Sequence, residues 1–578
     1  MCLPQFDSEP FFTSLLDTDR GGEWSISPEG LRGGEQRYAD DTAIVVTLLE
    51  GDGGAVEVTD FMALRSGADL TEIASATRGQ FVRVARAVAG TVRLRVRFTP
   101  RSADRFGRLG GAYTVDSPDH PRLPLRLHSS HPLDDDGAGT LSTTVTLRAG
   151  ETYESALAWS PDRQIPGDAS TNALADRTAE AWRRWAAGVS YEGPQRHLVR
   201  RSAVTLKLLD HFSSGGIMAA ATSSLPEWIG GERNWDYRYT WVRDAAFSTY
   251  ALRRIGCTSE ADAFLAWTLG CAERDGKPSI MYALDGGQPP AERVDPDLAG
   301  WRDSAPVRWG NGAAGQTQHD VYGELLDVAF QWVRAGGAVD DHLWAMLVDL
   351  TETAASRWRS PDHGIWEIRA SGRPFTYSVG MCQVAVDRAL RIAALTGRPC
   401  PETRWRHASK EIRDALLTGA WDSHRGTFTE QLADDDGTGR GLDGALLALP
   451  LRRVVDFTDP RMVATVEAVR RDLDAGGGLL YRYRHEVSGD GLDGEEGAFL
   501  LCSFWLVDNL TEQGRLDEAL ALYDSLCARA NHVGLLSEEI DPRDGSFLGN
   551  FPQAFSHIGV IASGHRLARA IARTNGSR

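Results

Sequence analysis

Two patterns of apolar and polar positions divide the chain. Between residues 40 and 160, apolar residues alternate with polar ones, and many of them are β-branched. A period of two is typical of strands with one buried face, and Gly-rich turns such as Gly51–Gly54 suit the connections between them. We therefore expect residues 1–168 to form an antiparallel β-sandwich. The segments that carry the pattern are 43–49, 56–62, 81–88, 92–98 and 141–147.

A helical spacing replaces the alternation in the rest of the chain. Residues 169–193 form a short stretch with a helix-like pattern at 175–187, which predicts a helical linker. Twelve amphipathic or apolar segments follow, and twelve helices can pair into a double ring. Residues 194–578 are therefore predicted to form an (α/α)6 toroid, the expected catalytic domain. The segments are 194–211, 241–254, 258–275, 318–335, 339–357, 378–396, 402–418, 439–449, 460–473, 493–512, 514–530 and 552–575.

Long connections between the predicted helices hold much of the glycine and proline and many aromatic residues. Loops of such length in a compact domain are usually functional, so we expect the site to lie where they converge. The connections are 276–317, 359–377, 476–492 and 533–551.

Composition narrows the classes of partner. The 62 Lys and Arg residues face 80 Asp and Glu residues, a formal net charge of −18, which disfavours nucleic acid and anionic membrane surfaces but is compatible with a neutral small molecule. No apolar run is long enough to span a bilayer, and no signal peptide is visible. The seven cysteines are scattered without a CxxC spacing, so we expect reduced thiols, a cytoplasmic location, no metal site and no cofactor.

The segment 230–247 concentrates aromatic rings beside an adjacent arginine and aspartate. It contains Tyr237, Trp241 and the pair Arg243–Asp244. Aromatic rings cover the apolar face of a sugar, while a guanidinium and a carboxylate bind its hydroxyls. The segment alone favours another interpretation, a buried, ion-paired helix start with aromatic packing, and only the motifs further along the chain favour a sugar site.

Acidic residues in two of the long loops offer a catalytic pair. Glu367 directly follows Trp366, and Glu538 and Glu539 lie together in the segment 534–542. Cleavage of an acetal with inversion needs one carboxylic acid that protonates the leaving oxygen and one carboxylate that activates water. A carboxyl beside an indole is partly desolvated, which suits the acid. A single loop glutamate is usually a solvated charge, so the hypothesis depends on the two loops facing each other.

Several strings of the sequence together resemble glycoside hydrolase family 15, the group of glucoamylases, glucodextranases and bacterial α,α-trehalases. The resemblance covers nearly the whole chain, and its strings occur in the family's order. It implies a β-sandwich ahead of an α/α toroid, the architecture that the apolar pattern predicts independently. The strings lie at 219–227, 233–244, 307–311, 316–324, 364–367, 480–483, 494–499, 502–505, 537–539 and 549–557.

The resemblance also implies roles for single residues. Glu367 would be the general acid and Glu538 the general base, with Glu539 as the alternative base. The remaining site residues would bind the substrate. Arg243 and Asp244 would bind the sugar hydroxyls, Tyr237 and Trp241 would form a wall beside the sugar ring, and Arg482 would contact the same sugar from another loop. Trp366 would shield the acid, and Phe555 would lie near the base.

The sequence departs from the family in two places. Relatives usually carry further residues before the string that begins here at Met1, so either the start was assigned too late or the sandwich is N-terminally truncated. If Met1 is the true start, we expect Phe11, Phe12, Leu15 and Leu16 to lose cover. Val379 and Gln383 stand where relatives usually have Lys and Trp, which changes either the subsite of the leaving group or only the packing of that helix.

The ending of the chain resembles the trehalase branch more than the secreted glucoamylases. We therefore expect an inverting, exo-acting α-glucoside hydrolase whose small-molecule substrate is α,α-trehalose. The alternative is a glucoamylase or α-glucosidase that acts on maltooligosaccharides or glycogen ends. A disaccharide phosphorylase would need a phosphate pocket in place of Glu538, and a non-catalytic carbohydrate-binding protein would not need two acids.

Overall fold

The computed structural model describes residues 1–72, 76–103, 105–159, 170–211, 213–276, 278–433 and 441–576. The chain divides into two compact units. Unit 1 consists of Met1–Val189 with Asp295–Asp303 and Asn531–Gly534, and unit 2 consists of Ser190–Val294, Ser304–Ala530 and Leu535–Arg578. The boundary that we predicted at residues 168 and 169 lies outside the described residues.

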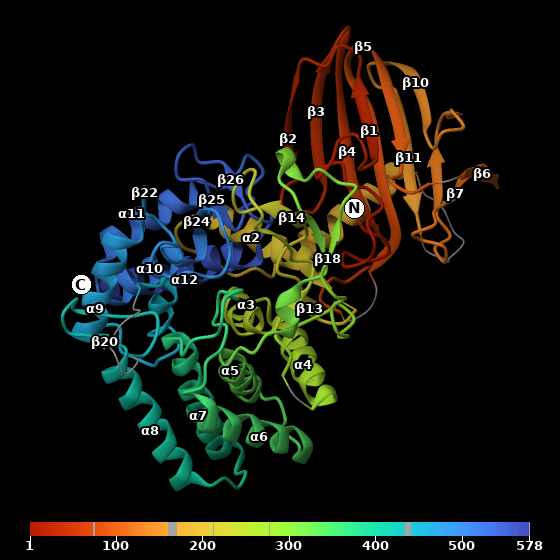
Figure 1. The fold of residues 1–578 in the computed structure, drawn as a ribbon. Helices are drawn as coiled ribbons and strands as arrows, with labels where there is room; N and C mark the ends of the chain where they lie inside the picture. Colours follow the sequence, from red (N-terminus) through yellow and green to blue (C-terminus); the bar gives the residue numbers. More distant parts are fainter. Residues whose placement is uncertain are drawn as a thin grey trace. The chain divides into compact units, whose positions relative to one another are not determined.

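Unit 1 is built on antiparallel strands (Figure 1). One sheet has the order β2-β3-β4-β5-β11-β8-β7-β6, and a second sheet forms where β1 and β10 pair with the same strand β5. The strands are β1 (Glu23–Pro28), β2 (Gly33–Tyr38), β3 (Val45–Gly51), β4 (Gly54–Leu64), β5 (Thr77–Thr99), β6 (Arg105–Leu109), β7 (Ala112–Asp116), β8 (Arg126–Ser129), β9 (Asp134–Asp135), β10 (Leu141–Arg148) and β11 (Thr152–Ala158).

Strand β5 belongs to both sheets. Its first half pairs with β4 and β11, and the half after Gly90 pairs with β1 and β10. Gly90 has φ +68°, and a Cβ there would lie 2.0 Å from the carbonyl oxygen of Gly53, so glycine permits the bend. The two strands predicted at 81–88 and 92–98 are therefore one strand, because a bent strand keeps its alternation on both sides of the bend.

Apolar side chains of the two sheets meet in a common core. Ile26 of β1, Val58 of β4, Leu94 of β5 and Val145 of β10 belong to the same buried cluster, as expected for a sandwich. The helix predicted at 175–187 is α1 (Thr171–Ala186), and it packs its Leu174 and other apolar residues against the first sheet.

The N-terminal segment is well covered. Phe11, Phe12 and Leu16 are buried, and the rings of Phe11 and Phe12 lie 6.2 and 5.5 Å from that of Phe98. The expectation that these three residues lose cover is therefore wrong, since β5 supplies the ring that covers the two phenylalanines. Leu15 is 42% exposed.

Unit 2 is a ring of paired helices (Figure 1). The inner elements α3, α5, α7, η3, α10 and α12 contact one another in that order and close the ring, and each packs against one or two outer helices. The helices are α2 (Arg196–Leu209), α3 (Val242–Arg254), α4 (Thr258–Asp275), α5 (Asp320–Arg334), α6 (Asp341–Arg357), α7 (Thr376–Thr396), α8 (Glu402–Gly419), the 3-10 helix η3 (Gly444–Ala448), α9 (Pro460–Asp472), α10 (Leu500–Glu512), α11 (Leu516–Cys527) and α12 (Ala554–Gly576).

Two of the predicted helices are shorter in the structure than the sequence pattern indicates. The segment 439–449, of which 439 and 440 lie outside the described residues, contains only η3, which Asp443 caps through Ala445 N–H and which Pro450 follows. The segment 493–512 becomes helical only at Leu500. Gly494 has φ +94°, and Ala498–Phe499 form the short strand β24.

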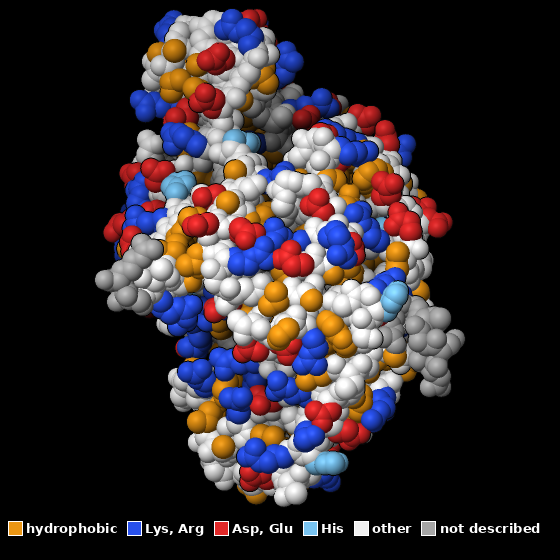
Figure 2. All heavy atoms as spheres, turned by 90° about the vertical axis from the view of Figure 1, so that its left-hand side faces the viewer, with side chains coloured by type: hydrophobic (Ala, Val, Ile, Leu, Met, Phe, Trp, Pro, Cys, Tyr) orange, Lys and Arg blue, Asp and Glu red, His pale blue; other side chains and the backbone are white. Residues whose placement is uncertain are grey.

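Charged side chains of both signs are interspersed on the face drawn in Figure 2, and hydrophobic side chains occur there singly or in small groups. The excess of acidic residues is thus not gathered on this face into one patch. Among the described residues, none of the helices has both the length and the apolar character that a membrane span requires.

Candidate active site

One cavity in unit 2, of about 60 Å³, is lined by all nine residues predicted for the site. It also includes Ala219, Ile365, Phe499 and Gln553, which the sequence reasoning did not name as site residues although each lies in or beside one of the quoted strings. The nine residues are Tyr237, Trp241, Arg243, Asp244, Trp366, Glu367, Arg482, Glu538 and Phe555.

The cavity lies at the N-terminal ends of inner helices. Arg243 and Asp244 belong to the first turn of α3, Phe555 belongs to the first turn of α12, and Phe499 directly precedes α10. Helix N-termini carry a partial positive charge and unpaired N–H groups, which favour negative or electron-rich atoms. The fold therefore places the two catalytic candidates in a region suited to carboxylates and sugar oxygens.

Glu367 is held in a strained turn. Its φ is +60°, a left-handed conformation that is uncommon for residues other than glycine. The amide of Gln316 donates to the carbonyl oxygens of Glu367 and Ile368 at 3.1 and 3.2 Å and fixes this turn. One carboxylate oxygen accepts from Trp241 Nε1 at 2.7 Å and from Arg243 Nη2 at 3.3 Å. The carboxyl group thus has a defined direction into the cavity.

Most of the N–H donors of Arg243 form hydrogen bonds with other groups of the protein. Its guanidinium contacts Asp320, Gln318, the carbonyl oxygen of Ile365 and Glu367, which engages four of its five N–H donors. The buried, ion-paired arrangement that the sequence left open therefore does exist. Arg243 nevertheless lines the cavity, and it orients Glu367 from there.

Asp244 is a buried carboxylate with an open position. Its side chain is 2% exposed, and its Oδ2 has no hydrogen-bond partner. Burial raises the pKa of Asp244 to about 8, against the lowering effect of the Arg243 charge. A buried acceptor without a donor is costly, and a hydroxyl group of a ligand would supply one.

Glu538 faces the same cavity with a free oxygen. Its Oε2 has no hydrogen-bond partner, and a Cβ on Gly549 would lie 2.7 Å from it, so glycine leaves room for this carboxyl. Burial raises the pKa of Glu538 well above its ordinary value, and the charge of Glu227 adds to the shift. Arg482 and a hydrogen bond from Tyr237 lower it.

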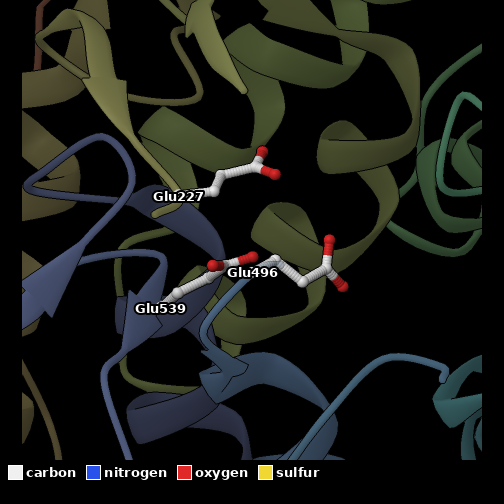
Figure 3. Close-up of side chains that lie close together, drawn as sticks. All are labelled: Glu227, Glu496 and Glu539. Atoms are coloured by element: carbon white, nitrogen blue, oxygen red, sulfur yellow. The ribbon is translucent and has the colours of Figure 1, made fainter. Parts of the chain in front are cut away.

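Glu539, the alternative base, turns away from this cavity. It is not among the lining residues, and its Oε2 accepts from the backbone N–H of Gly497 at 2.7 Å. It belongs to a buried group with Glu227 and Glu496, in which one oxygen of each lies within 4.8 Å of the others (Figure 3).

Arg482 supplies positive charge to this buried group. Its Nη2 lies 3.2 Å from Glu227, and its Nε donates to Glu496 at 2.8 Å. Three carboxylates could offer oxygen ligands to a cation, but a guanidinium already contacts two of them. The arrangement is an ion-paired cluster that fixes Arg482 in the lining of the cavity.

A second cavity of about 40 Å³ adjoins the first. The two share Tyr237, Trp366, Glu367 and Arg482, so Glu367 stands at their boundary. The second cavity continues to Trp235, whose ring lies between two guanidinium groups, those of Arg308 at 4.6 Å and Arg369 at 4.7 Å. Other members of its lining include Glu227, Arg233, Asn311, Tyr483 and Asp490.

The two departures on α7 lie away from both cavities. Val379 is buried, and Gln383 donates to Ser409 of α8 at 3.1 Å. In the described part of the chain, neither residue lines either cavity, so packing between helices accounts for their contacts.

Comparisons with known proteins agree with this arrangement. The model of the glycosyl hydrolases family 15 matches residues 193–565, and that of a trehalase-like N-terminal domain matches residues 1–110. The protein is thus a glycoside hydrolase with an antiparallel β domain ahead of a helical catalytic domain. The chain belongs to glycosyl hydrolase family 15.

Full-length relatives and one solved structure extend the comparison. A trehalase of Mycolicibacterium smegmatis is 36% identical over 99% of this chain and 88% of its own length. Trehalases of Mycobacterium tuberculosis and Thermoplasma acidophilum are 34% and 33% identical, over 99% and 98% of this chain and 86% and 96% of their own lengths. A bacterial glucoamylase complexed with acarbose superposes with a TM-score of 0.67 at 13% identity, over 96% of this chain and 88% of that one, which supports the two-part fold predicted from the sequence.

Proposed function

We propose that the protein hydrolyses α,α-trehalose to two glucose molecules with inversion, using Glu367 as general acid and Glu538 as general base. The observation that carries the proposal is the pair of adjoining cavities that meet at Glu367. A general acid must reach the oxygen between two sugar rings, so a ring on each side of Glu367 is the arrangement that a disaccharide requires. The relatives named trehalases over nearly the whole chain support this substrate.

In the proposed reaction, one glutamate donates a proton and the other accepts one. Glu367 gives its proton to the glycosidic oxygen as the bond from that oxygen to the anomeric carbon breaks. Glu538 takes a proton from a water molecule whose oxygen forms the new bond to the same carbon from the opposite face. The first product is therefore one β-glucose and one α-glucose. For inversion the two carboxyl groups should lie about 6.5–9.5 Å apart in the substrate complex.

Binding in the first cavity would rest on Asp244 and on the aromatic rings. The free oxygen of Asp244 would accept a sugar hydroxyl, while Tyr237 and Trp241, whose rings lie 5.5 Å apart at 69°, would form a wall beside the ring. Arg482 would bind from the other side, where its ion pairs hold it.

Product analysis tests the proposal. The purified enzyme is incubated with trehalose, maltose and isomaltose, and the first anomers released are followed by proton NMR. We expect trehalose to be hydrolysed with the highest kcat/KM and β- and α-glucose to appear in equal amounts. Two α-glucose molecules would contradict inversion, and preferred hydrolysis of maltose would assign the enzyme to the glucoamylase alternative.

A variant separates substrate binding from folding. Asp244→Asn should lower kcat/KM for trehalose by about 10- to 100-fold, because a polar group left without a partner in a buried site costs about 1–3 kcal/mol. The melting temperature should not fall. An unfolded Asp244→Asn protein would show that the carboxylate serves the structure instead.

A further inference from the structure

A larger cavity of about 380 Å³ lies inside the ring of helices of unit 2. Its lining comes from all five inner α-helices and from the residues just after η3, so it follows the axis of the ring. On α3, Arg243 and Asp244 at the first turn line the catalytic cavity, whereas Tyr250, Arg253 and Arg254 at the last turns line this one. The two cavities therefore occupy opposite ends of the same helices.

Aromatic rings separate the axial cavity from the catalytic one. Phe247 and Trp505 line the axial cavity, and their rings lie 5.8 Å apart. Phe247 contacts Phe555 at 5.9 Å, and Trp505 contacts Trp366 at 6.2 Å, two residues of the catalytic cavity. The axial cavity thus has a floor of rings as well as a charged lining.

Arginine dominates that charged lining. Seven arginines line the cavity with two aspartates. Some of them are neutralised: Arg388 pairs with Asp327 at 2.5 Å, and Arg566 pairs with Glu512 at 2.9 Å. Among the ion pairs of the described residues, none includes Arg254, Arg334 or Arg453.

Arg254 is the least exposed of these three arginines. It is half-buried, and it stacks on Tyr250 and contacts the hydroxyl of that ring. Burial lowers the pKa of Arg254 to about 9, together with the charges of Arg566 and Arg569, while the charges of Asp508 and Glu512 act in the opposite direction. A partly buried cation that forms no ion pair of its own is costly unless an anion accompanies it.

The helix ends explain only part of this charge. Carbonyl groups at a helix C-terminus attract cations, and Arg253, Arg254 and Arg334 lie in the last turns of α3 and α5. Arg453 lies outside any helix end, and it has φ +66°. Helix C-termini therefore do not account for all of the arginines that line the cavity.

We propose that the axial cavity is a binding site for a small organic anion that carries two or more negative charges beside a planar ring. Arg254, Arg334 and Arg453 would bind the charged groups, since arginine binds phosphate and carboxylate oxygens in pairs. The aromatic rings of the cavity would contact the planar part. A volume of about 380 Å³ lies within the range of small-molecule sites.

Isothermal titration of the full-length enzyme with ADP tests the proposal, with adenosine and pyrophosphate as separate probes. We expect ADP to bind, adenosine to bind at least about tenfold more weakly, and the affinity for ADP to fall as salt rises. Arg254→Ala should weaken ADP binding by at least about tenfold. Arg413→Ala, an exposed arginine of α8 outside the cavity, should stay within about twofold of the wild type.

Three results would overturn the proposal. The first is no heat of binding with ADP up to about 1 mM. The second is equal affinity of the wild type and the Arg254→Ala variant. The third is pyrophosphate binding as tight as that of ADP, which would leave the rings without a role. Should Arg254→Ala fail to fold, the double variant Arg334→Ala and Arg453→Ala gives the same comparison, because both side chains are exposed.

Discussion

At the scale of single residues, the neighbouring glutamates Glu538 and Glu539 have different surroundings. Glu538 faces the candidate active-site cavity with a free oxygen, whereas Glu539 accepts a backbone hydrogen bond in the buried cluster. Their adjacency in the sequence gives no means of choosing between them, because one step along a strand reverses the direction of a side chain. The choice depends on the register of the short strand β25 (Glu539–Ile540), which pairs with β24.

Substitution of the two glutamates separates their roles. Glu538→Gln should lower kcat for trehalose by at least about 10³-fold while glucose still binds, because an amide cannot take a proton from water. Glu539→Gln is the matched control, and it should keep kcat within about tenfold, since its amide oxygen can still accept from Gly497. Initial rates and a glucose titration of both variants measure this. The reverse result would transfer the role of base to Glu539.

The pH dependence of kcat/KM tests the environment of Glu538. A base acts only when ionised, so activity should be lost as pH falls through its raised pKa. Glu227→Gln removes a charge that raises the pKa of Glu538, and the acidic limb should shift to lower pH. Tyr237→Phe removes a hydrogen bond that lowers this pKa, and the limb should shift to higher pH. Shifts in the same direction for both variants would contradict the assignment.

At the scale of elements, the turn that carries Glu367 is held by its own backbone hydrogen bonds and by one side-chain amide. Gln316 holds the carbonyl oxygens of residues 367 and 368 while Glu367 keeps φ +60°. Gln316→Ala should lower kcat by about tenfold with little change in the melting temperature, because a displaced acid loses its alignment. Gln288→Ala, an exposed residue of the same long connection, is the control. Equal kcat values for the two variants would show that the turn keeps its conformation without the amide of Gln316.

The elements also show how far a sequence pattern predicts a fold. Helices such as α4 (Thr258–Asp275) match their predicted ranges, because a long amphipathic segment buries one face whatever its partners. The bend of β5 and the short η3 were not predicted. In β5 the alternation of residues continues through Gly90, and in η3 the apolar residues suit a helix that Asp443 and Pro450 restrict to one short turn. A local sequence pattern shows which residues are buried. It does not show the strand pairing that bends β5 or the flanking residues that shorten η3.

Of the nine site residues, Arg482 and Phe555 were predicted only through resemblance, and the roles given to all nine stay predictions. Their spacing along the chain spans several loops, and no periodicity relates Tyr237 to Arg482 or Phe555. The partners of Arg243 come from the start of α5, from the residues just before it and from the turn that carries Glu367, so only the folded chain brings them together.

At the scale of the whole molecule, buried carboxyl groups govern stability near neutral pH. Burial raises the pKa of Asp244 and Glu324 to about 8 and that of Asp362 and Asp443 to about 7. A carboxyl with a raised folded pKa binds a proton in the native state that the unfolded chain has already released. Stability therefore falls as pH rises through these values.

The window that isolates this effect is pH 6.5–8. The buried His557 and the half-buried His565 have pKa values lowered to about 3 and about 4, so they oppose the trend only below the ordinary histidine range. We expect the free energy of unfolding, measured with urea in the absence of sugar, to decrease from pH 6.5 to pH 8. Asp244→Asn should make the slope shallower. A free energy that increases over this window would contradict the burial of these groups as neutral acids.

Strand β5 has a consequence for how the β unit could be divided. A cut after Gly90 would leave β1 on the first fragment and its pairing partner, residues 94–99, on the second, while β11 of the second fragment pairs with residues 80–86 of the first. Each fragment would then hold strands whose neighbours lie on the other, so neither could close a sheet by itself. The two fragments would therefore fold only when they bind each other. A split reporter made by this cut would report the association of the two fragments.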